Sequence, residues 1–580
     1  MRGSTAVRAL AAAILGITVV GASSAGGTPV PAATAGADTS LFVPGFVSAG
    51  ASTPIVRTVT PTLTPPLRDL VPIPPEPSGG PIEVSPFQEP GPAPGPRDRP
   101  DPVVQRAAGT RVMPAPIMTF EGLNNDDNPG TTLVLPPDVE GDVGPNHYFE
   151  WVNIAFRIFD RAGAPLTAPM AGNTLFASLP SGKCKTTNSG DPLVLYDQFA
   201  DRWVVSQFTG SAAPQFQCTA VSKTPDPTGA YYLYPFQIPV NTFNDYGKIG
   251  LWPDAYHFSF AGFPGGGGFT PAVMAVERAK MLAGLPAQLV YFESSTSPAL
   301  AASAQQRLLP ADLDGSTLPP VGEPTPYVMH DDVQDQLEVY EFHVDWTTPA
   351  LSAITKVADL PVAPFDTVFT CNTGMQTRQC IPQPATANRI DVLATRLMYR
   401  LAYRNFGTHQ ALVVNQSVDA DVDHAGVRWY ELRDPHGTPT VHQQATYAPG
   451  TPGELGDHRW MGSAAMDNDG NLAIGYSISN HATIFPSIRY AGRLATDPPN
   501  ELTQGEATMF AGAGSQIAAN FVLPTSTARW GDYTHMSIDP VDDCTSGTST
   551  STTRATRSSR PRAFGAPGSA RSSSRPAPRW

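Results

Sequence analysis

The chain has 580 residues, of which 15% are charged, and its formal net charge is −14 at pH 7. A nucleic-acid partner is therefore not expected, because phosphate binding requires a surplus of Lys and Arg. The 62 Pro and 51 Gly residues argue against a mainly helical protein, since both residue types interrupt helices.

The N-terminal residues 1–25 have the features of a secretory signal peptide. Arg2 and Arg8 give a positively charged start, the apolar run Ala9–Val20 comes next, and small residues follow it. This run is too short to span a bilayer, so we expect an exported protein without a transmembrane segment after processing. Residues 26–112 are dominated by Pro, Ala, Gly, Ser and Thr and predict a disordered linker.

The five cysteines are expected to pair in part, because exported proteins meet oxidising conditions. Cys371 and Cys380 are close in sequence and predict a disulfide that closes one loop. Cys184 and Cys218 flank two strand-like segments and predict a disulfide between them. Cys544 is left without a partner.

Residues 113–545 predict one large all-β domain. Apolar residues alternate along Trp151–Phe159, which predicts a half-buried strand, and a turn follows at 160–163. Leu193–Asp197 and Arg202–Ser206 predict a hairpin. Each of these units combines an apolar strand, an acidic turn and an aromatic strand.

The same construction recurs further along the domain. It appears in Trp460–Asp467 followed by Leu472–Ser477, and again near Met536–Asp539. Gly-Asp pairs accompany two of the units, at 141–142 and 190–191. The recurrence predicts a β-propeller of about six or seven four-stranded blades, with tandem β-sandwiches as the alternative fold.

The composition changes abruptly at residue 546. Residues 546–580 are mostly Ser, Thr, Arg, Pro and Ala, which predicts a disordered basic tail. A second interpretation is a frameshift product, because one choice of codons for Ser546–Thr553 encodes an aromatic-rich strand after a shift of one base. The closing strands of the domain would then be missing.

Aromatic and arginine residues are the main candidates for ligand binding. Arg-Trp pairs, with an aspartate nearby, predict a rim of stacking and polar groups at a central channel that suits sugars. The alternative is that these aromatic side chains pack between blades. The candidates are Arg202, Trp203, Arg459, Trp460, Arg529, Trp530 and Asp532.

The segment Phe156-Arg157-Ile158-Phe159 resembles the Phe-Arg-Ile-Pro signature of sialidases, which are secreted propellers, but Phe159 replaces the proline. The resemblance implies that Arg157 binds a substrate carboxylate, for which a guanidinium is suited. The alternative is an ordinary strand with an exposed arginine.

Carboxylates at alternate positions make Asp419, Asp421 and Asp423 the candidate metal ligands, and Ca²⁺ the candidate cofactor. No obligatory cofactor is expected. The spacing differs from that of an EF-hand, since His424 stands where that loop has Gly. Asp312–Gly315 and Asp467–Gly470 are further acidic segments, and plain Asx turns explain each of them equally well.

Gly190–Gln198, Asp201–Trp203 and Arg529–Tyr533 resemble a group of uncharacterised exported bacterial proteins. The resemblance implies export and repeated β structure, and no activity. Catalytic residues are unknown because no catalytic motif occurs. We expect a monomeric, secreted or surface-displayed binding module with a carbohydrate or protein ligand. The alternative is an extracellular glycan hydrolase that uses paired carboxylates.

Overall fold

The computed structural model describes residues 52–72, 99–124, 136–265, 267–302, 307–371, 379–516, 531–552 and 566–573. In this part the chain consists almost entirely of strands and loops, and most strand pairs are antiparallel. The all-β class is thus confirmed. No helix of the described part has the length and hydropathy needed to cross a bilayer. The expected signal peptide, 1–25, lies outside the described residues.

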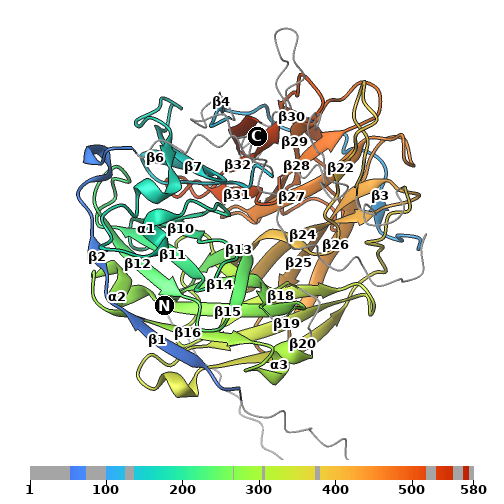
Figure 1. The fold of residues 1–580 in the computed structure, drawn as a ribbon. Coiled ribbons are helices and arrows are strands. Elements are labelled where there is room, and N and C mark those ends of the chain that lie inside the picture. The colour runs from blue at the N-terminus through green and yellow to red at the C-terminus, as the bar shows by residue number, and fades with distance from the viewer. Residues whose placement is uncertain are drawn as a thin grey trace, which may run out of the picture. The chain divides into compact units, whose positions relative to one another are not determined.

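Antiparallel strands follow one another along the chain, as the colours from blue to red show in Figure 1. In the described part they fall into seven hydrogen-bonded units of four strands, some of which belong to larger sheets. The first three are formed by β5 (Val139–Val143), β6 (His147–Val152), β7 (Ala155–Asp160) and β8 (Met170–Ala171); by β9 (Leu193–Asp197), β10 (Arg202–Phe208), β11 (Phe216–Ser222) and β12 (Tyr231–Gln237); and by β13 (Thr242–Leu251), β14 (Ala255–Pro264), β15 (Thr270–Glu277) and β16 (Ala287–Glu293).

The next three units repeat this order. They are formed by β17 (Leu309–Leu313), β18 (Thr325–Asp331), β19 (Gln336–His343) and β20 (Ala353–Pro361); by β23 (Leu397–Asn405), β24 (Gln410–Asp419), β25 (Ala425–Arg433) and β26 (Thr440–Tyr447); and by β27 (His458–Met466), β28 (Leu472–Ser479), β29 (Ser487–Arg493) and β30 (Glu506–Phe510). A parallel pairing of β17 with β23 joins two of these units into one larger sheet.

The seventh unit combines both ends of the chain. It contains β31 (His535–Ile538), β32 (Thr545–Thr552) and β33 (Ala566–Ser573), and its fourth strand is β4 (Met118–Glu121). Elsewhere in the described part, β21 (Gln379–Ile381) and β22 (Ile390–Asp391) form a small separate pair. Helices there are short: α1 (Lys183–Thr186), α2 (Arg278–Leu282), α3 (Pro298–Ala301), η1 (Leu67–Asp69), η3 (Gly172–Thr174) and η4 (Pro349–Leu351).

The first strands of successive units lie next to one another. They contact each other in the order β5, β9, β13, β17, β23, β27 and β31, and β31 also contacts β5. The series therefore closes on itself. Residues at corresponding ends of these seven strands are brought together, although hundreds of residues separate them in sequence.

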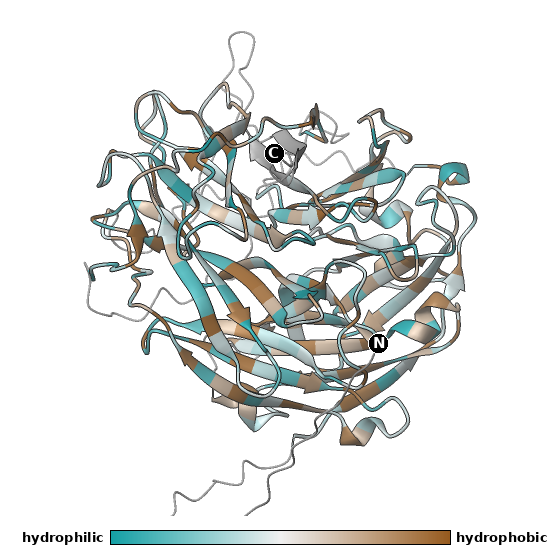
Figure 2. Cartoon of the chain, turned by 180° about the vertical axis from the view of Figure 1, so that it is seen from behind, coloured by the Kyte–Doolittle hydropathy of each residue, from teal (hydrophilic) through white to brown (hydrophobic). Residues whose placement is uncertain are grey.

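Apolar side chains fill the space between successive units. Phe149 of the first unit packs with Trp203 of the second, and Tyr447 of the fifth packs with Tyr476 of the sixth, with ring centroids 6.0 Å apart in each pair. Hydrophobic and hydrophilic residues alternate along many strands (Figure 2). Large aromatic side chains bury much apolar surface in such layers, which stabilises the sheets face to face.

Parts of the expected linker, 26–112, form edge strands instead of a structureless spacer. β1 (Ile55–Val59) pairs with β16, β2 (Thr62–Leu63) with β12, and β3 (Val104–Gln105) with β26. An extended segment of this kind needs no apolar periodicity, because main-chain hydrogen bonds to an open sheet edge hold it. Composition alone therefore did not reveal these strands.

Two further segments differ from expectation. Trp151–Phe159 is not one strand, because the chain turns between β6 and β7, where Asn153 has φ 43°. Asn tolerates this left-handed conformation better than most residues, and its side-chain nitrogen donates to Pro136 O at 2.9 Å. The expected tail, 546–580, contributes most of β32 and all of β33 to the seventh unit.

Both expected disulfides are present. Cys184 pairs with Cys218, and Cys371 pairs with Cys380. The first links α1 to β11, and the second links Cys371 to β21. Cys544 takes part in neither of these disulfides, and its Sγ donates to Asp467 Oδ2 at 3.7 Å.

Candidate functional site

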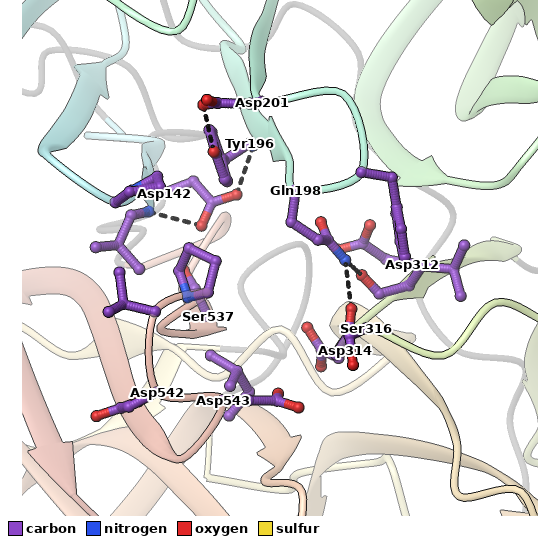
Figure 3. Close-up of a pocket in the computed structure, with 18 of the residues that line it drawn as sticks. Asp142, Tyr196, Gln198, Asp201, Asp312, Asp314, Ser316, Ser537, Asp542 and Asp543 are labelled. Carbon is purple, nitrogen blue, oxygen red and sulfur yellow. Dashed lines mark hydrogen bonds between the residues drawn. The ribbon is translucent and has the colours of Figure 1, made fainter.

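A cavity of about 510 Å³ opens where β5, β9, β17, β23 and β31 meet. Its lining is strongly acidic, and Figure 3 shows Asp142 and Ser537 facing Asp312 and Asp314 across the open space. The aspartates of the lining are Asp142, Asp201, Asp312, Asp314, Asp542 and Asp543. The closed series of first strands explains how residues from both ends of the domain reach one cavity.

Asp142 lies near the end of β5 and is held by the backbone. Its carboxylate accepts hydrogen bonds from the amides of Val143 and Tyr196, each at 2.7 Å. Burial raises the pKa of Asp142 to about 6, although the Tyr196 amide and the Ser537 hydroxyl act in the opposite direction. The carboxyl is therefore fixed in place and titrates close to neutral pH.

Arg400 of β23 binds two of the facing carboxylates. Its Nε lies 2.8 Å from Asp312 Oδ2, and its two terminal nitrogens bind Asp314 at 2.9 and 2.5 Å. Burial lowers the pKa of Arg400, but Asp314 and Asp312 outweigh this effect, and the net shift is upward. Burial raises the pKa of Asp312, despite the nearby guanidinium. The single guanidinium of Arg400 thus forms ion pairs with both carboxylates.

The other aspartates of the lining also have fixed partners. Asp201 accepts from the Tyr196 hydroxyl at 2.6 Å, and Arg404 binds Asp543 at 2.7 and 3.0 Å. Burial raises the pKa of Asp542, but hydrogen bonds from Thr545 outweigh it, and the net direction is downward. The cavity is consequently a set of oriented acceptor oxygens with a negative balance of charge.

His535 of β31 lines the cavity and is bound to a buried carboxylate. Its Nδ1 lies 2.6 Å from Glu140 Oε1, and both side chains are almost fully buried. Burial raises the pKa of Glu140. Burial, and secondarily Arg400, lowers the pKa of His535 well below its usual value. The imidazole is therefore neutral at pH 7.

The structure places three predicted ligand-binding residues in the first two units. Arg157 lies on β7 and donates to Thr167 O at 3.1 Å. Arg202 begins β10 and donates at 2.7 Å to the backbone oxygen of Asp201 in the turn before it. Trp203 is buried, and its ring centroid lies 5.0 Å from that of Tyr196. Trp203 thus supports a wall of the cavity without lining it.

Of the remaining ligand-binding candidates, those among the described residues do not line the cavity either. Arg459 binds Glu506 at 2.8 and 3.1 Å, and Trp460 is fully buried in the core. Asp532 precedes β31, at the end of that strand away from Ser537, and its backbone oxygen accepts from Tyr246 at 3.2 Å. Arg529 and Trp530 lie outside the described residues.

The three predicted metal ligands each bind different protein groups. Asp419 accepts from the amides of Asp421, Asp423 and His424 at 3.0–3.2 Å. Asp421 forms an ion pair with Arg106, and Asp423 accepts from the Thr370 hydroxyl at 2.8 Å. Burial raises the pKa of Asp419 to about 8. These contacts match an Asx turn, and Ca²⁺ binding remains a prediction.

Sequence reasoning named none of the cavity-lining aspartates as binding residues. A signal was present, because strands followed by Asp recur, and Asp312–Gly315 stood out as an acidic turn. The Gly141-Asp142 pair, expected before a strand, lies inside β5. Nothing in the local sequence shows that these strand ends converge, since the convergence depends on the order of the sheets around the series.

No known protein family and no curated protein matches the sequence. Among solved structures, an exo-β-1,3-galactanase from Phanerochaete chrysosporium has a TM-score of 0.26 at 10% identity, over 64% of this chain and 80% of that chain. The endo-arabinase from Bacteroides thetaiotaomicron has 0.26 at 9%, over 66% and 92%. The WD40 domain of SCAP from fission yeast has 0.28 at 8%, over 76% and 83%. Scores of this size carry no argument about fold or function.

Proposed function

We propose that the seven units are the blades of a β-propeller and that the acidic cavity lies at one end of its axis. Repeated four-stranded antiparallel meanders support this fold. The closed contact series from β5 to β31 supports it further. Tandem β-sandwiches would pack two sheets face to face in each module and would not give a single closed series of first strands.

We propose that the protein is a secreted binding module and that the cavity binds a hydroxyl-rich ligand of the carbohydrate class. The observation that carries this proposal is the fixed array of aspartate oxygens around a cavity of about 510 Å³. Hydroxyl groups donate well to carboxylates, whereas polyanions are repelled by them. Tyr196 and Phe199 add aromatic surface to the same lining.

A second candidate function is hydrolysis of a glycan in the same cavity. It is favoured by the pKa of about 6 at Asp142, which leaves part of this carboxyl protonated near neutral pH. Glycosidases use one protonated and one ionised carboxyl group, and Asp312 and Asp314 face Asp142 across the cavity. Extracellular action fits the two disulfides.

The test is calorimetric binding of a panel of neutral oligosaccharides to the full protein and to Ser316→Arg. Ser316 is exposed and lines the cavity, so an arginine there can occupy the acceptor oxygens. Thr317→Arg is the matched control, because this exposed neighbour does not line the cavity. We expect binding that Ser316→Arg weakens about tenfold or more, equivalent to about 1.4 kcal/mol, and that Thr317→Arg preserves.

Failure of every oligosaccharide to bind, or equal affinity of the two arginine variants, would contradict the binding proposal. Fluorogenic glycosides test the second candidate in parallel. Asp142→Asn should then abolish release of the fluorophore while oligosaccharide binding persists. Release that is unchanged in Asp142→Asn rules out Asp142 as the proton donor.

A further inference from the structure

A residue of the cavity lining belongs to a buried pair of groups that ligand binding alone does not require. His535 lines the cavity, and its Nδ1 is bound to Glu140 Oε1 at 2.6 Å. Glu140 is fully buried, and its second oxygen, Oε2, has no hydrogen-bond partner among the described residues. A buried carboxylate that forms its hydrogen bond with an imidazole fixes the orientation of that ring.

The other nitrogen of the same ring is left available. Within the described part of the chain, His535 Nε2 makes no hydrogen bond to the protein. The Tyr399 ring stands edge-on to the imidazole, with centroids 5.2 Å apart and an interplanar angle of 75°. The hydrogen bond at Nδ1 and the contact with the Tyr399 ring therefore hold the imidazole in place. When Nδ1–H donates its hydrogen bond to the ionised carboxylate of Glu140, Nε2 carries the free lone pair.

Strand geometry gathers the neighbouring reactive groups beside this pair. Glu140 and Asp142 are two residues apart on β5, and His535 and Ser537 are two residues apart on β31. Side chains two apart in a strand share a face, and β5 contacts β31. An oriented base, a carboxyl group and a hydroxyl thus border a single cavity.

We propose that His535 is a general base and that the cavity hydrolyses an acyl ester of its hydroxyl-rich ligand, in effect an O-acylated carbohydrate. This inference rests on the proposed function, because the alcohol part of the ester would occupy the aspartate-lined cavity. Glu140 is a positioning residue that holds the tautomer of His535. An imidazole that served structure alone would be expected to satisfy both nitrogens within the protein.

The reaction balances without a cofactor. His535 Nε2 takes a proton from a water molecule as the water oxygen forms a bond to the acyl carbon. The ester C–O bond then breaks, the carboxylic acid forms, and the alcohol leaves with a proton supplied by the imidazolium. Neutral His535 is regenerated, and one water has been consumed.

Hydrolysis of p-nitrophenyl acetate measures this base without knowledge of the natural ester. We expect release of p-nitrophenolate by the full protein, with kcat reduced about 100-fold in His535→Gln and with a smaller reduction in Glu140→Gln. His481→Gln is the matched control, because His481 is exposed and its Nδ1 binds Leu455 O at 2.8 Å, outside the cavity. This control should keep full activity.

Two further measurements protect the test against misfolded variants. Ser316→Arg fills the cavity without altering the pair and should reduce turnover, whereas Thr317→Arg should not. NMR of protein labelled with ¹⁵N-histidine should show His535 protonated at Nδ1 in the wild type and should show this preference lost in Glu140→Gln. If the His535–Glu140 pair served only structure, loss of the Nδ1–H tautomer of His535 would not be accompanied by loss of ester hydrolysis.

The inference is overturned if His535→Gln releases p-nitrophenolate as fast as the wild type, or if His535 is protonated at Nε2. The proposed function fails separately. Oligosaccharide binding without ester turnover refutes the general base and keeps the binding site. Turnover that depends on His535, without binding of any oligosaccharide, keeps the base and refutes the carbohydrate class.

Discussion

Asp142 shows how burial at a single residue couples the cavity to pH. The unfolded carboxyl ionises near 3.8, and the folded one near 6, because burial disfavours its charge. Between these values the unfolded chain releases a proton that the folded chain keeps. The contribution of Asp142 to stability therefore falls as pH rises through this window and is constant above it.

We expect Asp142→Asn to remove this dependence. The difference in Tm, variant minus wild type, should become more positive from pH 4 to pH 6 and then level off. Thermal unfolding followed by circular dichroism at each pH measures it. A difference that stays flat from pH 4 to pH 6 would show that Asp142 keeps an ordinary pKa.

The pKa of Asp421 is shifted in the opposite direction, so this residue serves as the control. Burial raises its pKa, but hydrogen bonds from His424 and Arg106 outweigh burial and lower it to about 2. Its stabilising contribution is present above pH 3.8 and is lost as pH falls towards 2. Asp421→Asn should lower the Tm by the same amount at pH 5, 6 and 7, and by less below pH 4.

The Arg400 cluster is expected to contribute more to stability than any exposed ion pair. Arg400→Met leaves Asp312 and Asp314 buried without their shared cation, which costs about 3–5 kcal/mol. The exposed pair Arg68–Asp226, with side-chain exposures of 54% and 44%, is the comparison. Arg68→Met should cost about 1 kcal/mol or less. Urea unfolding measures both, and equal losses would argue against the buried cluster.

At the scale of elements, the N-terminal segment is attached through side chains as well as strands. Asp101 and Arg428 are both fully buried and lie 3.2 Å apart, just before β3 pairs with β26. The same aspartate oxygen accepts from Val103 N at 2.9 Å. Asp101 therefore connects the edge strand β3 to the centre of the fifth unit.

Asp101→Ala should release this attachment. We expect a loss of about 3 kcal/mol from the unpaired arginine and faster tryptic cleavage after Arg106 and Arg111. Arg57→Ala is the control, because this exposed side chain donates to its neighbour Val56 O. Limited proteolysis followed by mass spectrometry gives the answer. Identical cleavage rates in the two variants would show that the ion pair does not hold the segment.

At the scale of the whole molecule, closure depends on strands from both ends of the chain. β4 pairs with β33, and β32 pairs with β31, so the seventh unit exists only when both ends meet. A chain ended after Cys544 lacks β32 and β33, and it leaves the edges of β31 and β4 open. Open edges promote association between molecules.

The truncated chain is expected to unfold at lower temperature and to elute as aggregates. A chain ended after Ser573 keeps both strands and is the matched control. Size-exclusion chromatography with light scattering compares the two. A monomeric product with the wild-type Tm after truncation at Cys544 would show that ring closure does not need these strands. Resequencing the locus tests the frameshift hypothesis independently.

Local chemistry in the sequence determined much about this protein. Short apolar segments next to acidic turns predicted strands such as β9, β10, β27 and β28, and the structure buries nearly every side chain of these four strands. Cysteine spacing gave both disulfides. The strands depend on residues that are neighbours in the sequence, and each disulfide depends on the chemistry of two thiols. Both features can therefore be predicted without a structure.

Only the tertiary structure decided the site. Asp142, Asp312, Arg400 and His535 come from four strands spread over about two thirds of the chain, and no local pattern marks them as neighbours. Their meeting depends on the closed order of the first strands. The edge strands β1 to β3 could not be predicted from the sequence for a related reason. Main-chain hydrogen bonds hold them in place, so their sequences need no periodic pattern of apolar residues.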